Sequence, residues 1–509
     1  MKKVITILFL VPLSIYSQTA LYIQEYNDTK GMISNQGYLF HDKSSGIGYY
    51  QVPKTLSSVD EVLSIYITTI LSMGKVDDVL KGVGPGYPNF EFGAGPIAND
   101  YNLGTYVSTY DRIWSVYRTE VLNHILNWDQ LGYVVPLSIS SWPGNGNILN
   151  GEAQILAPFE DVNGNSIYEP ELGEYPLIRG DQATFCILND ENNSHLSSGL
   201  SPLKQEIHLM TYQYATDDCL SQTTFLHFEI FNRSPEVYTD YTFGLLNDYD
   251  LGNFADDFVG SDSNLSLSYV YNGDSNDENN GVTNGYGVNP PAFGFMELNQ
   301  NLSSNVPFDA MDANTGSFNN MKGLKGDGTA VLDALSAPTS FSFDNSIDVN
   351  NTEKELGNIP SDKRMVLGTT SSTLNSGESI CRDFAMIYAR ADSYITGLES
   401  VDSLKLVASF TQNFYDSMNF SCTPMVGIKE LSKSNSLTVF PNPADKLLTI
   451  SLEGEFEFSI MSLEGKLIQK GKIVNSEINV ESLNSGVYYL EIISDKGVST
   501  TKFSKNKNY

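Results

Sequence analysis

Apolar and polar side chains alternate along much of this chain, a pattern typical of strands whose two faces meet different surroundings. Residues 223–234 (TTFLHFEIFNRS) place Phe225 on one face and Leu226 on the other, and residues 63–74 and 383–392 are similarly rich in β-branched and aromatic side chains. Stretches dense in Gly, Pro, Asn and Asp separate these runs. We therefore expect a mainly β protein, with a β-sandwich-like body of packed antiparallel sheets and few helices.

Two segments instead repeat their apolar side chains every three or four residues, which predicts helices. The first is residues 108–128, where Ile113, Val121 and Ile125 share one face. Its aromatic side chains are interpreted as core rather than as a ligand site. The second is residues 393–418, directly before the C-terminal part of the chain.

The first residues read MKKVITILFLVPLSIYSQ, with two lysines before an apolar run and the small Ser17 after it. This order predicts a secretory signal peptide over residues 1–17, with a buried N-terminal strand as the alternative. The run is too short to span a bilayer as a helix, and no later stretch approaches the ~18 apolar residues that a transmembrane helix needs. We expect an exported chain with no transmembrane helix.

The C-terminal residues form a separate pattern. Residues 431–436 are small and polar and are interpreted as a linker between a body, residues 18–430, and a last domain, residues 437–509. The body is long enough for two subdomains. After the linker, short strand-like runs and turns alternate at intervals of roughly ten residues, which predicts a small immunoglobulin-like β-sandwich.

Four motifs in this last domain resemble the type A sorting domain of the type IX secretion system: VFPNPADKLLTI, SLEGKLI, VESLNSGVYYLEI and the basic end KFSKNKNY. The resemblance implies the type IX machinery as a partner, and passage across the outer membrane after signal-peptide export. It also implies removal of the domain in many relatives, followed by release or attachment to surface lipopolysaccharide. We therefore expect an extracellular or outer-membrane surface location. An ordinary immunoglobulin-like binding module is the alternative.

Charge separates the two parts as well. The formal net charge is −31, and the nine lysines and nine acids from residue 431 onward cancel, so all of the excess acid lies in the body. Such a body repels nucleic acid and suits divalent cations, although acidity also favours solubility alone. We expect no nucleic-acid partner.

The most suggestive acidic stretch is FEDVNGNSIYEPELGEYPLIRGDQ, residues 159–182. Calcium takes six to eight oxygen ligands, and loops supply them from alternate positions. Here positions 1, 3, 5, 7 and 9 would be Asp161, Asn163, Asn165, the carbonyl of Ile167 and Glu169. We predict a calcium loop, with an unoccupied acidic turn and a catalytic carboxylate pair as alternatives.

This stretch departs from an EF-hand in two positions. Position 6 is Ser166 rather than glycine, and position 12 is Leu172, which has no oxygen in its side chain. Another acid must then complete the shell, and the candidates are Glu171 or Glu174, with Asp181 as a further ligand.

A second acidic cluster is LLNDYDLGNFADDFVGSD. Its carboxylates repel one another unless a cation neutralises them, so it is a second candidate metal site, with a solvated acidic loop as the alternative. The candidate ligands are Asp248, Asp250, Asp256 and Asp257. Segments of the body, including both acidic clusters and SSWPGNG, resemble uncharacterised surface proteins that carry the same sorting domain; this resemblance implies no particular reaction.

The four cysteines predict up to two disulfides, because the expected compartment is oxidising and the count is even. Chain order favours Cys186–Cys219 and Cys381–Cys422, with buried free thiols as the alternative.

No known catalytic motif is present: the chain has no H-E-x-x-H, no G-x-S-x-G and no phosphate-binding loop. The missing motifs and the predicted calcium loop together favour a noncatalytic, calcium-stabilised body used in adhesion or in binding extracellular glycans or proteins. Its 29 tyrosines suit such contacts. The alternative is a secreted carbohydrate-active hydrolase, which needs only two suitably placed carboxylates.

Overall fold

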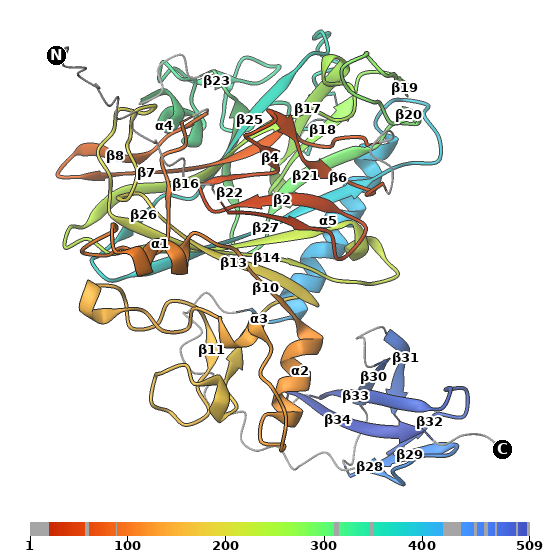
Figure 1. Ribbon diagram of the computed structural model, residues 1–509. Helices are drawn as coiled ribbons and strands as arrows, with labels where there is room; N and C mark the ends of the chain where they lie inside the picture. The colour runs from red at the N-terminus through yellow and green to blue at the C-terminus, as the bar shows by residue number, and fades with distance from the viewer. Residues whose placement is uncertain are drawn as a thin grey trace, which may run out of the picture.

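The chain forms a large body of two sheets and a smaller C-terminal β domain (Figure 1). This computed structural model describes residues 20–55, 61–87, 89–309, 315–346, 348, 350–420, 439–451, 456–462, 467–473, 476–494 and 497–505. The predicted signal peptide and the predicted linker, residues 431–436, lie outside the described residues. The expectation of a mainly β fold with few helices is confirmed. No helix in the described part of the chain is long and apolar enough to cross a membrane.

The first sheet is antiparallel and has ten strands. Along its main path run β1 (Leu21–Gln24), β2 (Lys30–Ser34), β3 (Tyr38–Leu39), β7 (Ile67–Val76), β16 (Tyr238–Tyr249), β25 (Lys363–Thr369) and β22 (Leu302–Pro307). Three more strands pair at its margins: β6 (Tyr50–Gln51), β8 (Val79–Val83) and β26 (Ser372–Leu374). The predicted strand over residues 63–74 is the long β7 at its centre.

The second sheet has nine strands and is also antiparallel. Its strands are β10 (Trp114–Tyr117), β13 (Gln182–Asn189), β14 (Gln205–Gln213), β15 (Thr224–Asn232), β27 (Ser379–Ala389), β21 (Ala292–Glu297), β18 (Leu267–Asn272) and β17 (Asp257–Asp262), with β9 (Gly93–Ala94) paired to β13. The strands predicted over residues 223–234 and 383–392 correspond to β15 and β27.

The main hydrophobic core lies between the two sheets. It joins side chains of the first sheet, such as Ile70 and Phe243, to side chains of the second, such as Phe228 and Phe384, and all four are fully buried. Because both faces of the central strands are covered, β13 and β14 are buried at every position. Their sequences accordingly alternate less clearly than that of β15.

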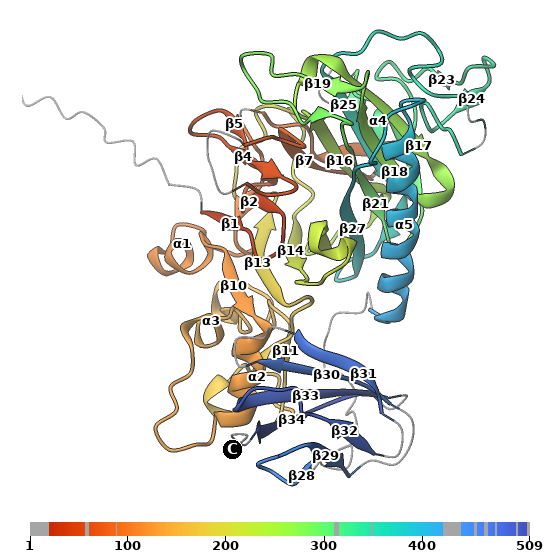
Figure 2. The same ribbon diagram turned by 90° about the vertical axis from the view of Figure 1, so that its right-hand side faces the viewer.

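Helices cover the two outer faces of this sandwich. On the first sheet, α4 (Thr315–Met321) packs Phe318 and Met321 over Leu71 and Val366. On the second sheet, α5 (Glu399–Ser417) lies along β27, β21 and β18 (Figure 2). The helix predicted over residues 393–418 is therefore present as α5.

The helix predicted over residues 108–128 is not one helix. The segment is split into α1 (Gly104–Tyr110), β10 and α2 (Arg118–Asn127). Trp114 and Val116 are buried in β10, which pairs with β13 at the edge of the second sheet. Pairing with an existing sheet edge overrode the local helical pattern.

The rest of the body is short elements. They are α3 (Leu137–Ser140), the 3-10 turns η1 (Ile148–Asn150), η2 (Pro170–Leu172), η3 (Cys219–Gln222), η4 (Phe254–Asp256) and η5 (Ser263–Leu265), and the strand pairs β4 (His41–Asp42) with β5 (Ile47–Gly48), β11 (Phe159–Glu160) with β12 (Tyr175–Pro176), β19 (Asn276–Asp277) with β20 (Gly287–Val288), and β23 (Val331–Leu332) with β24 (Pro338–Thr339).

Buried polar side chains tie the start of the body to the second sheet. Gln24 of β1 donates its amide to the Gln182 side chain at 2.6 Å. The hydroxyls of Thr29 and Thr224 lie 2.8 Å apart, and Asn27 donates to the carbonyl of Thr223 at 2.9 Å. These bonds are stronger in a dry interior than at the surface, so they fix the first strands in place.

The C-terminal domain has two small sheets and its own core. One sheet contains β28 (Val439–Phe440), β29 (Leu447–Ile450) and β32 (Glu477–Asn479); the other contains β31 (Leu467–Ile473), β30 (Phe456–Ser462), β33 (Gly486–Ser494) and β34 (Gly497–Lys505). Its hydrophobic cluster consists only of residues between 439 and 503. These strands follow the short runs that the sequence predicts.

The predicted disulfide between Cys186 and Cys219 is wrong, because both thiols are free. Cys186 lies inside β13, where burial raises the pKa of its thiol to about 12. Cys381 is disulfide-bonded, and its expected partner, Cys422, lies outside the described residues.

Candidate functional site

The acidic loop over residues 161–174 joins the two strands of a short hairpin. Glu160 of β11 pairs with Tyr175 of β12. Asp161 therefore follows the last paired residue of one strand and Glu174 precedes the first paired residue of the other. The pairing brings the first and last acids of the loop together, which their sequence separation alone does not reveal.

Asp161 organises the first half of the loop. One of its carboxylate oxygens accepts hydrogen bonds from the backbone N–H groups of Gly164 and Asn165, at 2.7 and 3.1 Å. The other accepts from the N–H of Ser166 at 2.7 Å. The chain can turn this tightly because Gly164 and Ser166 both adopt positive φ angles, 75° and 58°. Ser166 thus takes the left-handed conformation that the sixth position of an EF-hand assigns to glycine.

The remaining predicted ligands converge on Glu169. The side-chain amides of Asn163 and Asn165 donate to one oxygen of Glu169, at 3.1 and 2.6 Å. Their carbonyl oxygens accept backbone N–H groups of the same loop. The two amides and the carboxylate therefore surround one point, and rotating the amides would turn oxygens toward it.

Glu174 closes the loop from inside. It is fully buried, and one carboxylate oxygen accepts the backbone N–H of Glu169 at 2.7 Å. The other oxygen has no hydrogen-bond partner among the described residues. Burial raises the pKa of Glu174, and the nearby carboxylates of Asp161 and Glu169 raise it further. Glu174 is therefore the acid that faces the predicted ligands, while Leu172 at position 12 is half exposed.

Two neighbouring segments hold the loop in position. The buried His124 of α2, whose pKa is lowered by burial, lies 3.1 Å from the carbonyl of Glu174, to which its ring N–H donates. Asn145 accepts the backbone N–H of Tyr168 at 2.7 Å and donates to its carbonyl at 2.9 Å.

Two further predicted ligands differ in their surroundings. Ile167 is half exposed, and its backbone N–H donates to Asn165 at 2.7 Å. Asp181 contacts other groups: it accepts the N–H of Ala215 at 3.1 Å and lies 3.6 Å from Arg118.

The chemistry of the donors suits a hard divalent cation, although the carboxylate oxygens of Asp161, Glu169 and Glu174 do not all lie within 4.8 Å of one another, as those of Asp248, Asp250 and Asp362 do. Asp161, Asn163, Asn165, Glu169 and Glu174 supply carboxylate and amide oxygens, which calcium prefers, and no sulfur or imidazole. The orphaned oxygen of buried Glu174 is the feature that a bound cation would satisfy.

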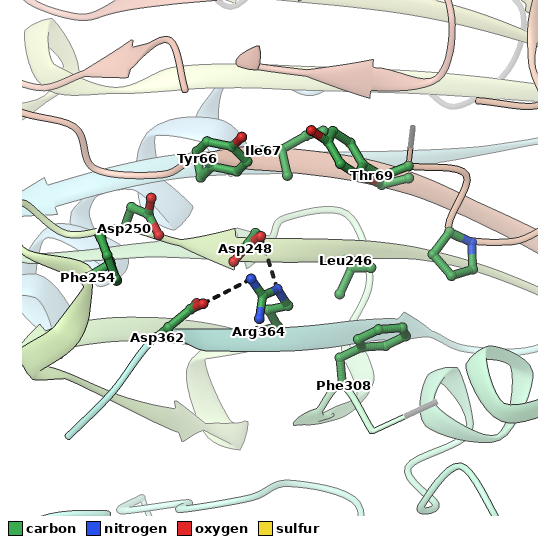
Figure 3. Close-up of a pocket in the computed structure, with 12 residues that line it drawn as sticks. Tyr66, Ile67, Thr69, Leu246, Asp248, Asp250, Phe254, Phe308, Asp362 and Arg364 are labelled. Carbon is green, nitrogen blue, oxygen red and sulfur yellow. Dashed lines mark hydrogen bonds and ion pairs between the residues drawn. The ribbon is translucent and has the colours of Figure 1, made fainter. Parts of the chain in front are cut away.

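The second acidic cluster borders a cavity of about 590 Å3 that is lined by the neighbouring strands β7, β16 and β25 of the first sheet (Figure 3). Asp248 and Asp250 meet Asp362 there, with one oxygen of each lying within 4.8 Å of the others. Arg364 bridges two of them, at 3.0 Å from Asp248 and 3.0 Å from Asp362. Aromatic and apolar side chains form the rest of the wall: Tyr66, Tyr87, Phe254, Phe308, Ile67 and Leu246.

The electrostatics of this pocket are unusual for carboxyl groups. Burial raises the pKa of Asp248 to about 7, although Arg364 opposes the shift. Burial raises the pKa of Asp250 to about 8, and the carboxylates of Asp248 and Asp362 add to the shift. Arg364 already occupies the position of a counter-ion, so the pocket can be partly neutral at physiological pH without a metal.

Asp256 and Asp257 do not line this pocket. Asp256 accepts the Asn253 side-chain amide at 2.9 Å, and the fully buried Asp257 accepts the N–H of Leu251 at 3.0 Å. Burial raises the pKa values of both, and the neighbouring Asp277 adds to the shift of Asp257. These acids fix the turn after β16 rather than joining Asp248 and Asp250.

Sequence reasoning missed half of the pocket. Asp362 and Arg364 lie more than a hundred residues from Asp248, and they arrive because β25 pairs with β16 in a register that sets Asp248 opposite Arg364. The run of charged residues in SDKR, at the start of β25, is the only local sign of a charged site here, and it cannot reveal that β25 pairs with β16.

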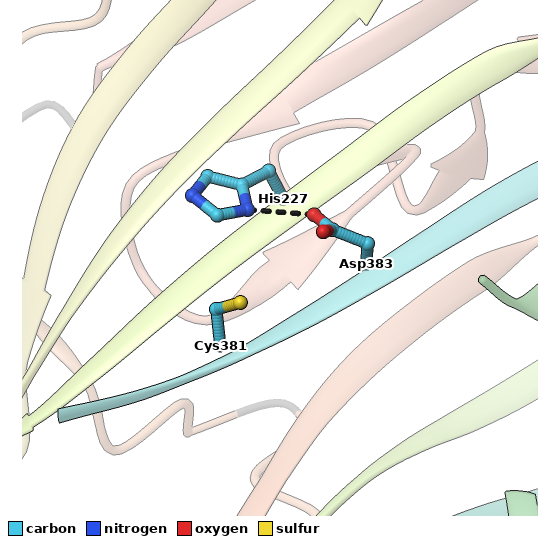
Figure 4. Close-up of side chains that lie close together, drawn as sticks. All are labelled: His227, Cys381 and Asp383. Carbon is cyan, nitrogen blue, oxygen red and sulfur yellow. Dashed lines mark hydrogen bonds and ion pairs between the residues drawn. The ribbon is translucent and has the colours of Figure 1, made fainter. Parts of the chain in front are cut away.

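A third group of side chains has a structural role. His227 and Asp383 lie beside Cys381 (Figure 4), but the sulfur of Cys381 is in a disulfide and is no thiolate ligand. Asp383 accepts hydrogen bonds from His227 at 2.6 Å, from Arg179 at 2.9 Å and from the Tyr415 hydroxyl. Burial opposes ionisation of Asp383, yet His227 and Arg179 hold its pKa well below the usual range.

Two sheets with helical outer layers, followed by a small β domain with its own core, define a multidomain, mainly β protein. Residues 438–506 match the family model of the secretion system C-terminal sorting domain. The last domain is thus the type IX sorting domain that its motifs predicted, and it directs export to the cell surface or the extracellular space.

Comparisons of the whole chain add little. A polysaccharide lyase matches with a TM-score of 0.20 and 8% identity over 60% of this chain and 34% of the lyase, so this chain spans about a third of that protein. A putative aldose 1-epimerase from Escherichia coli K12 matches with a TM-score of 0.23 and 10% identity, over 73% of this chain and 99% of the epimerase. TM-scores this low carry no argument about function. No curated protein matches in sequence.

Proposed function

We propose that the exported body is a calcium-stabilised, noncatalytic module that binds extracellular polymers. The observation that supports calcium most directly is Glu174. It is fully buried beside Asp161 and Glu169, and one of its oxygens has no partner among the described residues. A bound cation would neutralise these acids and supply that partner.

In the proposed calcium complex, Asp161, Glu169 and Glu174 supply carboxylate oxygens and Asn163 and Asn165 supply amide oxygens. The ion would bridge both ends of the hairpin loop and fix Tyr168, which is hydrogen-bonded to Asn145, against α3. Its role is therefore to rigidify the lobe that contains α2 and α3.

The polymer-binding part of the proposal is supported by the pocket at Asp248. Its volume of about 590 Å3 is typical of ligand sites, and its wall combines aromatic rings with a few charged groups. Sugar rings stack on exposed aromatic faces, while their hydroxyls bond to carboxylates and guanidinium groups.

Thermal unfolding of the mature protein with calcium and with a chelator tests the calcium proposal. A bound ion adds RT ln(1 + [L]/Kd) to stability, about 2.7 kcal/mol at a hundredfold excess over Kd. Chelation should lower the Tm of the body transition, and Asp161→Ala should abolish most of that difference. Asp129→Ala, an exposed acid outside the loop, is the control. Equal melting curves of the wild type in both conditions would refute calcium binding.

A glycan and protein binding array tests the polymer proposal. The mature protein should retain specific glycans or proteins, and Arg364→Met with Asp248→Asn should lose them. This double change removes a matched pair of charges and so limits its effect on folding. Retention that the double variant leaves unchanged would exclude the pocket as the binding site.

A second candidate function, a carbohydrate-active hydrolase, is favoured by one observation. Asp248, Asp250 and Asp362 have oxygens within 4.8 Å in an open pocket, closer than the ~6.5–9.5 Å that an inverting glycosidase needs for water and near the ~5 Å of a retaining one. Release of reducing sugar from an array ligand, abolished by Asp248→Asn, would establish hydrolysis. Intact ligand after prolonged incubation would exclude it for that ligand.

A further inference from the structure

A second pocket lies beside the acidic loop, and the loop builds one of its walls. Its volume is about 330 Å3, at the small end of ligand sites. Tyr168, Pro170 and Glu171 come from the loop. The other lining residues come from α1 through β10 and from the end of α3 and the segment after it: Thr109, Arg112, Trp114, Ser140, Ser141, Trp142, Pro143 and Asn145.

Arg112 is the cation of this pocket, and no carboxylate of the described residues forms an ion pair with it. The chain has seven arginines, and five of them lie within 4 Å of a carboxylate. Arg390 instead donates to three backbone carbonyls. In the described part of the chain, Arg112 donates only to the hydroxyl of Ser141, at 3.2 Å.

The position of the Arg112 side chain is fixed by its contacts. Its guanidinium lies over the ring of Trp114, 5.1 Å from the ring centre, and the Trp114 indole N–H donates to the Ser141 carbonyl at 2.6 Å. Burial lowers the pKa of Arg112. A stacked guanidinium keeps its planar edge free for two parallel hydrogen bonds to a carboxylate.

The remaining lining residues narrow the ligand class. Trp142 and Tyr168, both buried, line the pocket with aromatic surface, and Thr109, Ser140 and Ser141 add hydroxyl-bearing side chains; those of Thr109 and Ser141 donate to backbone carbonyls. Glu171 is exposed and is the single acid among the lining residues. A body that carries a net charge of −31 would otherwise repel anions, so an uncompensated arginine in a pocket marks a local site for one.

We propose that this pocket binds the carboxylate of an acidic sugar unit, a uronate, through Arg112, with the sugar ring against the aromatic lining of Trp142 and Tyr168. The proposal rests on the proposed function in one respect: the calcium loop holds Tyr168 and Glu171 in place, so binding should weaken when calcium is removed. It differs from the pocket at Asp248, whose acids would repel such a ligand.

Isothermal titration of the mature protein with trigalacturonate and with neutral galactotriose, both in calcium, tests the proposal. The acidic trisaccharide should bind and the neutral one should bind much more weakly. Arg112→Gln should weaken binding roughly 10- to 100-fold, the usual effect of deleting a charged donor. Arg112→Lys should restore part of the affinity.

Two further variants separate binding from folding. Glu171→Gln removes the acid that opposes the ligand, so affinity should rise roughly two- to fivefold. Arg118→Gln, six positions along and already paired with Asp181, should leave affinity unchanged.

Equal binding of the two trisaccharides, or unchanged affinity in Arg112→Gln, would overturn the proposal. If trigalacturonate binding depends on Arg112 but not on calcium, the pocket stands and its coupling to the loop is refuted, while the melting curves decide calcium binding itself. If calcium binds and trigalacturonate does not, only the pocket proposal fails.

Discussion

Asp250 shows how strongly one partly buried carboxyl group depends on its neighbours. The carboxylates of Asp248 and Asp362 lie close by, and the single cation of the group, Arg364, is bonded to those two acids rather than to Asp250. The pKa of Asp250 is therefore raised to about 8 by burial and then by its acidic neighbours. In the unfolded chain the same group titrates near its ordinary value of 3.8.

This difference predicts a pH-dependent stability. Because the folded state holds the proton more tightly, Asp250 favours folding below its unfolded pKa, and this contribution is lost as the pH rises through about 8. Asp250→Asn should therefore raise the free energy of unfolding at pH 9 by on the order of 2 kcal/mol, with little effect near pH 4. Urea unfolding in chelator at both pH values measures this. Parallel pH curves for the variant and the wild type would contradict it, and Asp129→Asn controls for net charge.

The cysteines give a second residue-scale prediction. Cys186 is buried in β13 and its thiol pKa is raised to about 12, whereas Cys219 is partly exposed. Alkylation of the native protein should modify Cys219 alone, and unfolding should add Cys186. Two further thiols should react only after reduction, as measured by intact-mass spectrometry. Modification of Cys186 in the native protein would mean that β13 opens readily.

At the scale of elements, a buried network joins α5 to the second sheet. Tyr415 of α5, His227 of β15 and Arg179 all donate to Asp383 of β27. The Arg179 and Asp383 side chains are 3% and 1% exposed, so each charge depends on the other in a dry interior. Arg179 also lies 4.3 Å from the centre of the Phe420 ring, just beyond the end of α5.

Removing one side chain of the network around Asp383 should therefore lower the free energy of unfolding markedly. Arg179→Met should lower the free energy of unfolding by about 3–5 kcal/mol, because it leaves Asp383 buried without its cation. Arg118→Met is the matched control: its pair with Asp181 is 3.6 Å long and a third exposed, so the loss should stay below about 1 kcal/mol. Urea unfolding measures both. If Arg179→Met and Arg118→Met lose similar free energies of unfolding, burial does not set the contribution of the Arg179–Asp383 pair to stability.

The sequence predicted elements best where one face alone was buried. β15 and α5 each present a clear period and were predicted at nearly their observed positions. The segment around Trp114 failed, because its apolar residues fit a helix as well as a strand and only the edge of β13 selects between them. The same limit applies to the sites. The loop at Asp161 is local, so the sequence alone could predict it as a calcium site, and that prediction stands untested; the preference for Glu174 over Glu171 rests on the pairing of β11 with β12.

For the whole molecule, charge and packing both divide the chain near residue 431. The C-terminal domain has its own hydrophobic cluster and a balanced charge, while the body carries the net charge of −31. A domain with its own hydrophobic core and no net charge is expected to fold, and to present the same surface, whichever protein it is attached to. The pocket at Asp248, in contrast, needs β7, β16 and β25 together, and no segment of the sequence contains it.

This division predicts that the sorting signal is portable. Residues 431–509, fused to a reporter that carries a signal peptide, should bring the reporter across the outer membrane in a host with type IX secretion. The same reporter without the domain should stay in the periplasm. Immunoblots of periplasmic and extracellular fractions measure this, and periplasmic retention of the fusion would show that the body also carries export information.

The buried polar bonds at the start of the body bear on the timing of folding during export. Gln24 bonds to a partner 158 residues further along the chain, and Thr29 to one 195 residues further. A chain that emerges with its N-terminal end first therefore presents Gln24 and Thr29 long before these two side-chain partners exist, although β1 can pair with β2 at once. Closing such distant contacts is slow, because the entropy of the intervening loop is lost before the contacts form. If the chain crosses the inner membrane behind the predicted signal peptide, Gln24 and Thr29 wait for these partners until Thr224 has emerged, and periplasmic chaperones can hold the open chain during that delay.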